Sequence, residues 1–256
     1  MTGQPTAELD VRPPEEAMCR ILDWDTNFFG FTVATATRAQ LTPVGAEKIM
    51  LECAESRVQC LYFLADAGDR NTISLLEQHN FALKDIRFTM ISRTGVSGSL
   101  KNDLPVREAE EADIPHLRRI ARTSHYESRF YADANFPSER CDDLYDLWIT
   151  KSCAHENADI VFVAELGGNA AGYITCKRVT PLRGQIGLFA VAEEARGRGV
   201  GSVLIRHAMD WFHNGGISDV VTVTQGENVR AVQFYERAGF VVENVQLWYH
   251  RWFDRC

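Results

Sequence analysis

The sequence has no long hydrophobic run, no excess of basic residues and no paired-cysteine motif, and each absence excludes a class of protein. No apolar stretch reaches the length of a membrane-spanning helix, about 18 residues or more. The 256 residues include 27 Lys and Arg against 35 Asp and Glu, a formal net charge of −8. Nucleic acids and acidic membrane surfaces are therefore not expected as partners. No basic segment followed by an apolar one opens the sequence, so we expect a cytoplasmic protein of one or two domains.

Cysteine and histidine also lack the spacings of disulfide frameworks and metal sites. The seven cysteines are odd in number and form no C-x-x-C pair, which favours reduced thiols. The seven histidines show no H-E-x-x-H or comparable spacing. We therefore propose no metal site from the sequence.

The most informative segment is residues 196–201, RGRGVG, between the apolar run 186–191 and a helical pattern. A strand, a glycine-rich loop and the start of a helix direct several backbone N–H groups to one point, where the helix dipole favours negative charge. With two arginines as countercharge, this predicts a ligand that carries several phosphates. The spacing of the glycines does not fit the G-x-G-x-x-G dinucleotide fingerprint, and the sequence contains no P-loop. A flexible turn before a helix is the alternative interpretation.

The elements after this loop can be read from periodicity. Apolar residues recur at helical spacing from Leu204 to Phe212, and residues 214–216, NGG, end this helix. Residues 218–224, SDVVTVT, favour a strand because they are rich in β-branched side chains. A short helix capped by Asn228 then ends at Gly239 and leads into a final strand.

This order of an apolar strand, R-x-x-G-x-G, helix, strand, N-x-x-A-x-x-F-Y and G-F resembles the GCN5-related N-acetyltransferases, the GNAT superfamily, over residues 105–255. The resemblance implies an α/β protein of the α+β type. Its mixed central sheet would have a splayed fourth and fifth strand and flanking helices. It also implies an enzyme that transfers an acetyl group from acetyl-coenzyme A directly to a primary amine.

The resemblance assigns roles to particular residues. Those implied to bind the coenzyme are Leu188, Phe189, Ala190, Val191, Arg196, Gly197, Arg198, Gly199, Val200, Gly201 and Asn228. Backbone groups of the strand would pair with the pantetheine arm, and the loop would hold the pyrophosphate. Tyr235 matches the tyrosine that protonates the departing thiolate, with a core aromatic as the alternative. His125, Glu127 and Asp133 lie in the segment expected near the acceptor, and the sequence does not single out a general base among them.

The first part of the chain reads as a separate unit. We predict an N-terminal domain at residues 1–91, a polar linker at 92–103 and the acetyltransferase domain at 104–256. The N-terminal elements expected from periodicity are a strand–turn–strand piece at 20–35, a helix at 46–56, a strand at 60–65, a helix at 73–79 and a strand at 81–91.

The two parts contain a faint repeat. Residues 75–81, LLEQHNF, match 234–240, FYERAGF, in residue type, and Ile86, Phe88 and Met90 then correspond to Val245, Leu247 and Tyr249. The N-terminal part would thus be a partial or degenerate GNAT-like domain without an RGRGVG-like loop, which shapes the acceptor site. Chance similarity of two helix–strand units is the alternative.

Two further segments resemble a subgroup that includes the dTDP-fucosamine (dTDP-4-amino-4,6-dideoxygalactose) acetyltransferases. They are residues 22–30, LDWDTNFFG, and residues 128–137, SRFYADANFP, which match an insertion between the first two helices. The resemblance implies an amino-sugar nucleotide as acceptor, with Tyr126, Arg129 and Tyr131 as substrate contacts. In the alternative, these side chains only pack a helix–loop–helix lid.

Other interpretations remain at this point. The acceptor could be another small amine, such as an antibiotic, an amino acid or a polyamine, or the chain could be an acyl-coenzyme A sensor without turnover. Edge strands could also pair two copies into a homodimer.

Overall fold

The computed structural model describes residues 17–95 and 104–253. In chain order, its elements are β1 (Cys19–Ile21), α1 (Asp23–Phe29), β2 (Val33–Ala36), α2 (Pro43–Glu55), β3 (Cys60–Asp66), α3 (Arg70–Gln78), β4 (Ala82–Arg93), β5 (Val106–Glu108), η1 (Glu111–Asp113), α4 (Ile114–Arg122), α5 (Ser138–Cys153), β6 (Ile160–Leu166), β7 (Asn169–Arg178), β8 (Arg183–Val191), η2 (Glu193–Ala195), α6 (Val200–Asn214), β9 (Asp219–Gln225), α7 (Val229–Arg237) and β10 (Val241–Trp252). No helix within these residues is long and apolar enough to cross a bilayer.

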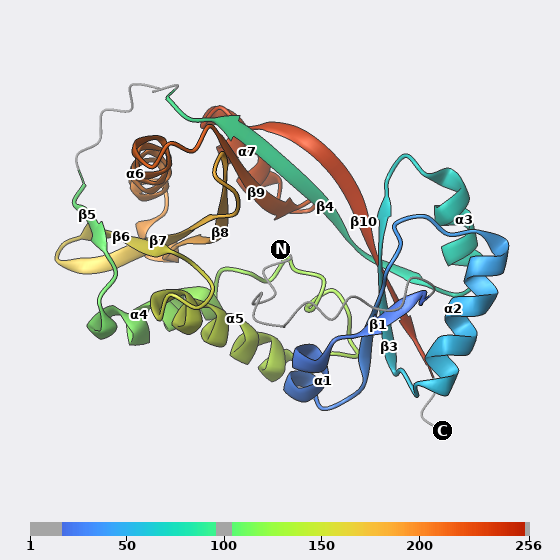
Figure 1. Ribbon diagram of the computed structural model, residues 1–256. Coiled ribbons are helices and arrows are strands. Elements are labelled where there is room, and N and C mark those ends of the chain that lie inside the picture. The colour runs from blue at the N-terminus through green and yellow to red at the C-terminus, as the bar shows by residue number, and fades with distance from the viewer. Residues whose placement is uncertain (1–16, 96–103, 254–256) are drawn as a thin grey trace.

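The strands of the described residues form one mixed sheet in the order β1-β2-β3-β10-β4-β9-β8-β7-β6-β5. Figure 1 shows α4 and α5 on one side of β6 to β8 and α6 on the other, with α2 and α3 beside β3 at the opposite end. A large core lies under α4, α5 and α6, and a smaller one, which includes Ile49, Phe63 and Leu76, lies under α2 and α3. The smaller core therefore belongs mainly to the N-terminal half, whereas the larger one also includes residues of that half, such as Phe29, Val33 and Tyr62.

The faint repeat of the sequence corresponds to two units of the same construction. β3, α3 and β4 contain 7, 9 and 12 residues, and β9, α7 and β10 contain the same numbers. Both turns after the helices use a left-handed residue at the same place, Asn80 with φ 58° and Gly239 with φ 88°. This agreement in length and turn geometry supports a true repeat over chance similarity.

The two units exchange their last strands. β10 lies between β3 and β4, and β4 lies between β10 and β9 (Figure 1). Arg87 pairs with Gln246, its counterpart in the repeat, and donates to its Oε1 atom at 2.5 Å. An approximate two-fold axis therefore passes between these residues. The sheet is continuous from one half of the chain to the other, and the division into two domains stays a prediction.

Segment 124–137 connects α4 and α5 and docks on β10 through a buried polar network. Asp133 accepts from His250 Nδ1 at 2.7 Å and from Trp252 Nε1 at 2.8 Å, and Lys84 Nζ lies 3.4 Å from its other oxygen. His250 Nε2 lies 2.9 Å from Arg129 Nη1. Because guanidinium only donates, Nε2 is the acceptor and His250 is neutral. The network fixes the segment that faces the candidate site.

The N-terminal elements match the predictions in part. The helices, the buried strand and the final strand lie close to their predicted ranges. Of the strand–turn–strand expected at 20–35, the two strands are confirmed as β1 and β2, which pair antiparallel, but the turn is wrong, because residues 23–29 form α1 between them. Phe29 is buried there, and Gly30 ends the helix with φ 79°. The predicted linker begins too early, since β4 continues to Arg93. Residues 96–103 of that linker lie outside the described residues.

We expect the folded state to lose stability in mild acid because a buried histidine, His250, and a partly buried one, His125, are neutral. Burial lowers the pKa of His250 to about 4, against the opposing effect of Asp133, and burial also lowers the pKa of His125 to about 4. An unfolded histidine has a pKa of about 6.5, so each contribution is complete above pH 6.5 and declines as the pH falls toward 4. Each could amount to about 3 kcal/mol.

The check is the urea midpoint of unfolding measured from pH 7.5 to 4. In His250→Gln, which keeps an acceptor for Arg129, the curve should be less steep than in the wild-type protein. Parallel curves would show that His250 does not cause the acid sensitivity.

Candidate active site

β8 and β9 run together and then separate. They pair in parallel as far as Ile186 and Thr222. Beyond that point β8 contains a bulge, where Gly187 and Leu188 stand opposite Thr175 of β7. The amide of Leu188 donates to Thr175 Oγ1 at 2.8 Å, which fixes the bulge. This is the splayed and bulged strand pair that the resemblance predicts.

The glycine-rich loop lies between η2 and α6 and prepares a helix N-terminus. Gly197 and Gly199 have φ values of 73° and 83°, a region that favours glycine. Gly199 is the N-cap of α6, and its carbonyl accepts from the amide of Val203 at 3.1 Å. The first amides of a helix have no carbonyl partner in their own helix and carry its positive dipole end. The loop therefore has the backbone geometry of a phosphate-binding site.

Tyr235 projects from α7 toward the place where β8 and β9 separate. Its ring is buried among Phe189, Phe234 and Phe240. Thr222 Oγ1 donates to the tyrosine oxygen at 3.2 Å, so the tyrosine proton remains available to another acceptor. Burial raises the pKa of Tyr235 to about 12, against a lowering effect of Thr222. The phenol is therefore protonated at neutral pH.

A cavity of about 290 Å³ opens between these elements, close to the lower limit of about 300 Å³ for ligand pockets. Its lining residues come from segment 124–137, β8, the glycine-rich loop, α6, β9 and α7. They are Ser124, His125, Glu127, Gly187, Phe189, Ala190, Val191, Arg196, Gly201, Val223, Thr224, Gln225, Asn228, Arg230, Ala231, Phe234 and Tyr235. A strand edge, a helix N-terminus and a buried phenol thus meet at one cavity.

The structure brings most of the predicted coenzyme-binding residues to this cavity. Phe189, Ala190, Val191, Arg196, Gly201 and Asn228 line it, together with Tyr235, the predicted catalytic residue. Leu188, Gly197, Arg198, Gly199 and Val200 belong to the same strand and loop but do not line the cavity. The Asn228 side-chain oxygen accepts from the amide of Ala231 at 3.0 Å and caps α7. With its side-chain oxygen used in this bond, Asn228 has its side-chain nitrogen as a hydrogen-bond donor.

Segment 124–137 supplies the wall opposite the loop. His125 stacks on Tyr145 and lies 3.2 Å from the hydroxyl of Tyr173, and with its lowered pKa it is neutral at pH 7. Glu127 is half-buried and also lines the cavity. Asp133 lies elsewhere, in the network with His250. Two of the three groups considered from the sequence as proton acceptors therefore lie at the cavity.

The three predicted acceptor contacts lie outside this cavity. Tyr126 is exposed and its ring meets the edge of Tyr131, whose hydroxyl donates to Asp142 at 2.5 Å. Arg129 is buried and lines a second cavity on the N-terminal side. Their contact with a substrate stays a prediction.

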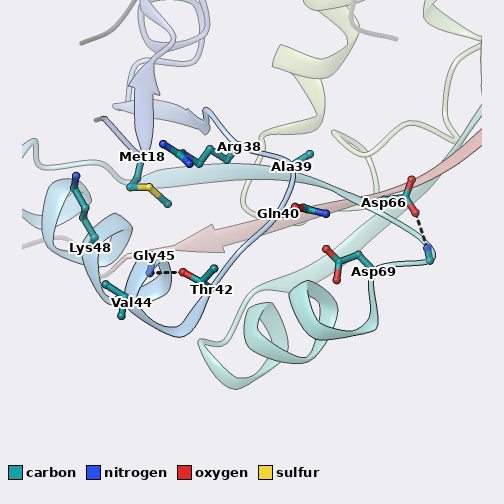
Figure 2. A pocket seen from close by; sticks show the side chains of 11 residues that line it. Met18, Arg38, Ala39, Gln40, Thr42, Val44, Gly45, Lys48, Asp66 and Asp69 are labelled. Atoms are coloured by element: carbon teal, nitrogen blue, oxygen red, sulfur yellow. Dashed lines mark hydrogen bonds between the residues drawn. The ribbon is translucent and has the colours of Figure 1, made fainter. Parts of the chain in front are cut away.

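The N-terminal half has a hollow at the corresponding place, with different chemistry (Figure 2). There the side chain of Thr42 caps α2 by accepting an amide of its first turn at 3.1 Å. Asp66 and Asp69 occupy the positions that Gln225 and Asn228 have in the other half. The N-terminal half thus has two carboxylates where the C-terminal half has the side-chain amides of Gln225 and Asn228, although Arg38 and Lys48 also line this hollow.

Known proteins resemble this chain in sequence. The sequence model of the Acetyltransferase (GNAT) family matches residues 119–240. The chain is 26% identical over 247 residues to dTDP-fucosamine acetyltransferase of Escherichia coli, covering 93% of this chain and 100% of the relative. It is 33% identical over 100 residues to N-alpha-acetyltransferase 30 of Schizosaccharomyces pombe, covering 38% of this chain and 67% of the relative. The chain therefore belongs to the GNAT acetyltransferase family and is an acyl-coenzyme A-dependent N-acyltransferase.

A third relative is the spore coat polysaccharide biosynthesis protein SpsD of Bacillus subtilis, 26% identical over 144 residues, with 56% of this chain and 49% of the relative covered. Among solved structures, a GCN5-related N-acetyltransferase from Sphaerobacter thermophilus has a TM-score of 0.60 at 15% identity, covering 91% of this chain and 76% of that one. A tandem GNAT protein from the clavulanic acid biosynthesis pathway has a TM-score of 0.56 at 12% identity, covering 88% and 76%. Both share the fold.

Sequence reasoning missed several residues of the site. Thr222 is hidden in a run of alternating Val and Thr, and its contact with Tyr235 depends on how α7 packs on β9. Gln225 and Arg230 flank the Asn228 motif, and their nearness to the motif was the only available signal. No group of three or more His, Cys, Asp or Glu within residues 17–95 and 104–253 could hold a metal ion.

We expect Gly199→Ala to weaken coenzyme binding more than it weakens folding. Gly216→Ala is the matched control, because it changes a glycine of similar φ, 77°, just beyond the other end of α6. Each substitution should lower the free energy of unfolding by about 1–2 kcal/mol through left-handed strain. Calorimetry should show affinity for coenzyme A reduced about tenfold in Gly199→Ala alone. Equal affinities in the two variants would argue against a phosphate site at this loop.

Proposed function

We propose that the protein transfers the acetyl group of acetyl-coenzyme A to the primary amine of a nucleotide-linked amino sugar. The observation that carries the proposal is the meeting of the strand edge, the glycine-rich loop and Tyr235 at one cavity. Bound acetyl-coenzyme A supplies a thioester carbonyl and a thiolate leaving group. The chain would supply position, hydrogen bonds and proton transfer.

Positioning would account for much of the rate. The exposed edge of β8 would hold the pantetheine arm, and the amides of the loop would hold the pyrophosphate. An amine that enters from the side of segment 124–137 would then meet the carbonyl carbon in line, which removes the entropic cost of bringing two molecules together. The amine nitrogen forms the new C–N bond as the C–S bond breaks. The proton that the nitrogen loses balances the one that the sulfur takes up.

Tyr235 would stabilise the departing sulfur. Thr222 already donates to the phenol oxygen, so the phenol proton is directed to a different acceptor. A thiol has a pKa of about 8.5 and Tyr235 one of about 12, so the phenol stays protonated and acts through a hydrogen bond as negative charge develops on sulfur. On the acceptor side, two groups at the cavity could take the amine proton. They are His125, which is neutral, and the carboxyl group of Glu127.

The nucleotide-linked acceptor is supported by the relatives. The match to the dTDP-fucosamine acetyltransferase covers the whole relative, and another relative is named for polysaccharide biosynthesis. The match to an N-alpha-acetyltransferase at 33% identity favours a peptide α-amine as the second candidate.

The six cysteines among the described residues are free thiols, which supports a place in the reducing cytoplasm.

Thiol release from acetyl-coenzyme A across a panel of amines tests the acceptor class. The panel contains dTDP- and UDP-linked amino sugars, unlinked amino sugars, aminoglycosides, amino acids, polyamines and N-terminal peptides. We expect kcat/KM at least tenfold higher for a nucleotide-linked amino sugar, because only that acceptor uses contacts beyond the amine. Preference for a peptide would replace the acceptor and keep the reaction. Coenzyme binding without release from any amine would favour a sensor.

Tyr235→Phe should lower kcat by about 100-fold or more and leave the Kd of coenzyme A nearly unchanged, because it removes one proton donor and keeps the ring. Tyr249→Phe is the matched control, since its buried phenol contacts Glu77 in the N-terminal half, away from the cavity. Stopped-flow thiol release and calorimetry give the two quantities. A Tyr235→Phe enzyme with wild-type kcat would remove the tyrosine from the mechanism.

A further inference from the structure

A second cavity, of about 320 Å³, lies beyond segment 124–137 on the N-terminal side. It is enclosed by β2, β3, β10, α5 and the region of α1. Figure 1 shows α5 extending from below β6 to β8 toward α1, which lies beside β1 and β3. The two halves of the chain thus build this cavity together, and the coenzyme features of the first cavity are absent from its described lining residues.

The walls of the second cavity combine flat aromatic rings with positive charge. Trp24, Trp148 and Trp248 line it, as do the guanidinium-bearing side chains of Arg20, Arg38 and Arg129. Asp25 is the only carboxylate among its described lining residues. This local excess of positive charge occurs in a chain of net charge −8. Aromatic faces bind a planar base, and arginines bind phosphate through paired N–H groups.

Arg129 is held in place rather than left to move. Its Cζ atom lies 4.0 Å from the ring centre of Tyr62, 4.2 Å from that of Phe130 and 4.5 Å from that of Trp248. His250 accepts one of its N–H groups, and this bond requires the neutral histidine of the Asp133 network. A buried guanidinium fixed between rings meets an anion without loss of side-chain freedom.

The two cavities border each other along the sheet. Gln225 of the first cavity pairs with Arg87, which pairs with Gln246 of the second. Directly paired residues of antiparallel strands point to the same face, so these three side chains form a row. Two strand spacings of about 4.8 Å separate the ends of the row by about 10 Å. Segment 124–137 also touches both cavities, with Glu127 at the first and Arg129 at the second.

We propose that the second cavity binds the nucleoside diphosphate part of the acceptor, with the base against the tryptophans and the phosphates near the arginines. The inference rests on the proposed function and deepens it. Because lining residues of the two cavities, Gln225 and Gln246, lie only about 10 Å apart, one nucleotide-linked sugar could extend from the second cavity into the first. The N-terminal half would then select the acceptor, while the C-terminal half performs the transfer.

The test is binding of dTDP, which contains no amine, to the protein saturated with coenzyme A. Coenzyme A fills its own site, so its adenosine diphosphate part cannot account for the signal. Arg38→Glu reverses a charge at the exposed rim, and Thr35→Phe fills space on the face shared with Tyr62. Arg70→Glu is the matched control, an exposed arginine of the same half outside the cavity.

By calorimetry, we expect dTDP binding to weaken about tenfold or more in Arg38→Glu and Thr35→Phe and to be unchanged in Arg70→Glu. In turnover, the ratio of kcat/KM for a nucleotide-linked over an unlinked amino sugar should fall in the same two variants. Circular dichroism and the urea midpoint show that each variant is folded.

Different results separate the inference from the function. If nucleotide-linked amino sugars are acetylated but dTDP does not bind, or binds equally to all variants, the second cavity is not the nucleotide site and the proposed function stands. If dTDP binding is lost in the two variants but no nucleotide-linked sugar is acetylated, the cavity is a nucleotide site and the proposed acceptor is wrong. Binding that disappears when coenzyme A is added would place dTDP in the coenzyme site and overturn the inference.

Discussion

The antiparallel pairing of β4 with β10 is the constraint on which the other features depend. Each strand is the last of its own unit and lies inside the sheet of the other, so neither half can close its hydrogen bonds alone. The pairing also sets Arg87 against Gln246 and thereby fixes the register of both halves. A slip by one residue would turn every side chain of a strand to the other face. The nearness of the two cavities follows from this register.

The same pairing explains why the candidate site opens where it does. β9 is paired with β4 along its whole length, from Asp219 to Gln225, and cannot follow β8. β8 turns away with β7 after the bulge at Gly187 and Leu188. The separation is therefore imposed from both sides. Backbone groups that would normally satisfy each other in a sheet become available to a ligand at the point where Tyr235 is buried.

The sequence was sufficient for the C-terminal fold and for much of the candidate site, because those features are local. The geometry of a loop such as RGRGVG, or of a helix capped by Asn228, is determined by a few neighbouring residues and can be predicted from them. α1 was missed because its N-cap is Leu22, which provides no side-chain cap, and because aromatic residues in a short run fit a strand equally well. The strand exchange and the contact of Thr222 with Tyr235 depend on residues far apart in the chain. Periodicity carries no information about such pairs.

If both proposed sites are correct, the repeat lets one fold serve two ligands through a few side chains. Pro43 removes an amide from the first turn of α2 and Thr42 occupies another, whereas Gly199 leaves the first turn of α6 to a ligand. Leu76 takes the position of Tyr235, so the N-terminal unit has no phenol at the place where the C-terminal unit has one. The loop before α2 in the N-terminal unit does not have to bind a coenzyme. One face of β2 and β3 can therefore face the C-terminal half instead. The two halves are alike in backbone but differ in chemistry. The first turn of α6 has no side-chain cap, whereas that of α2 is capped by Thr42, and three arginines line the second cavity.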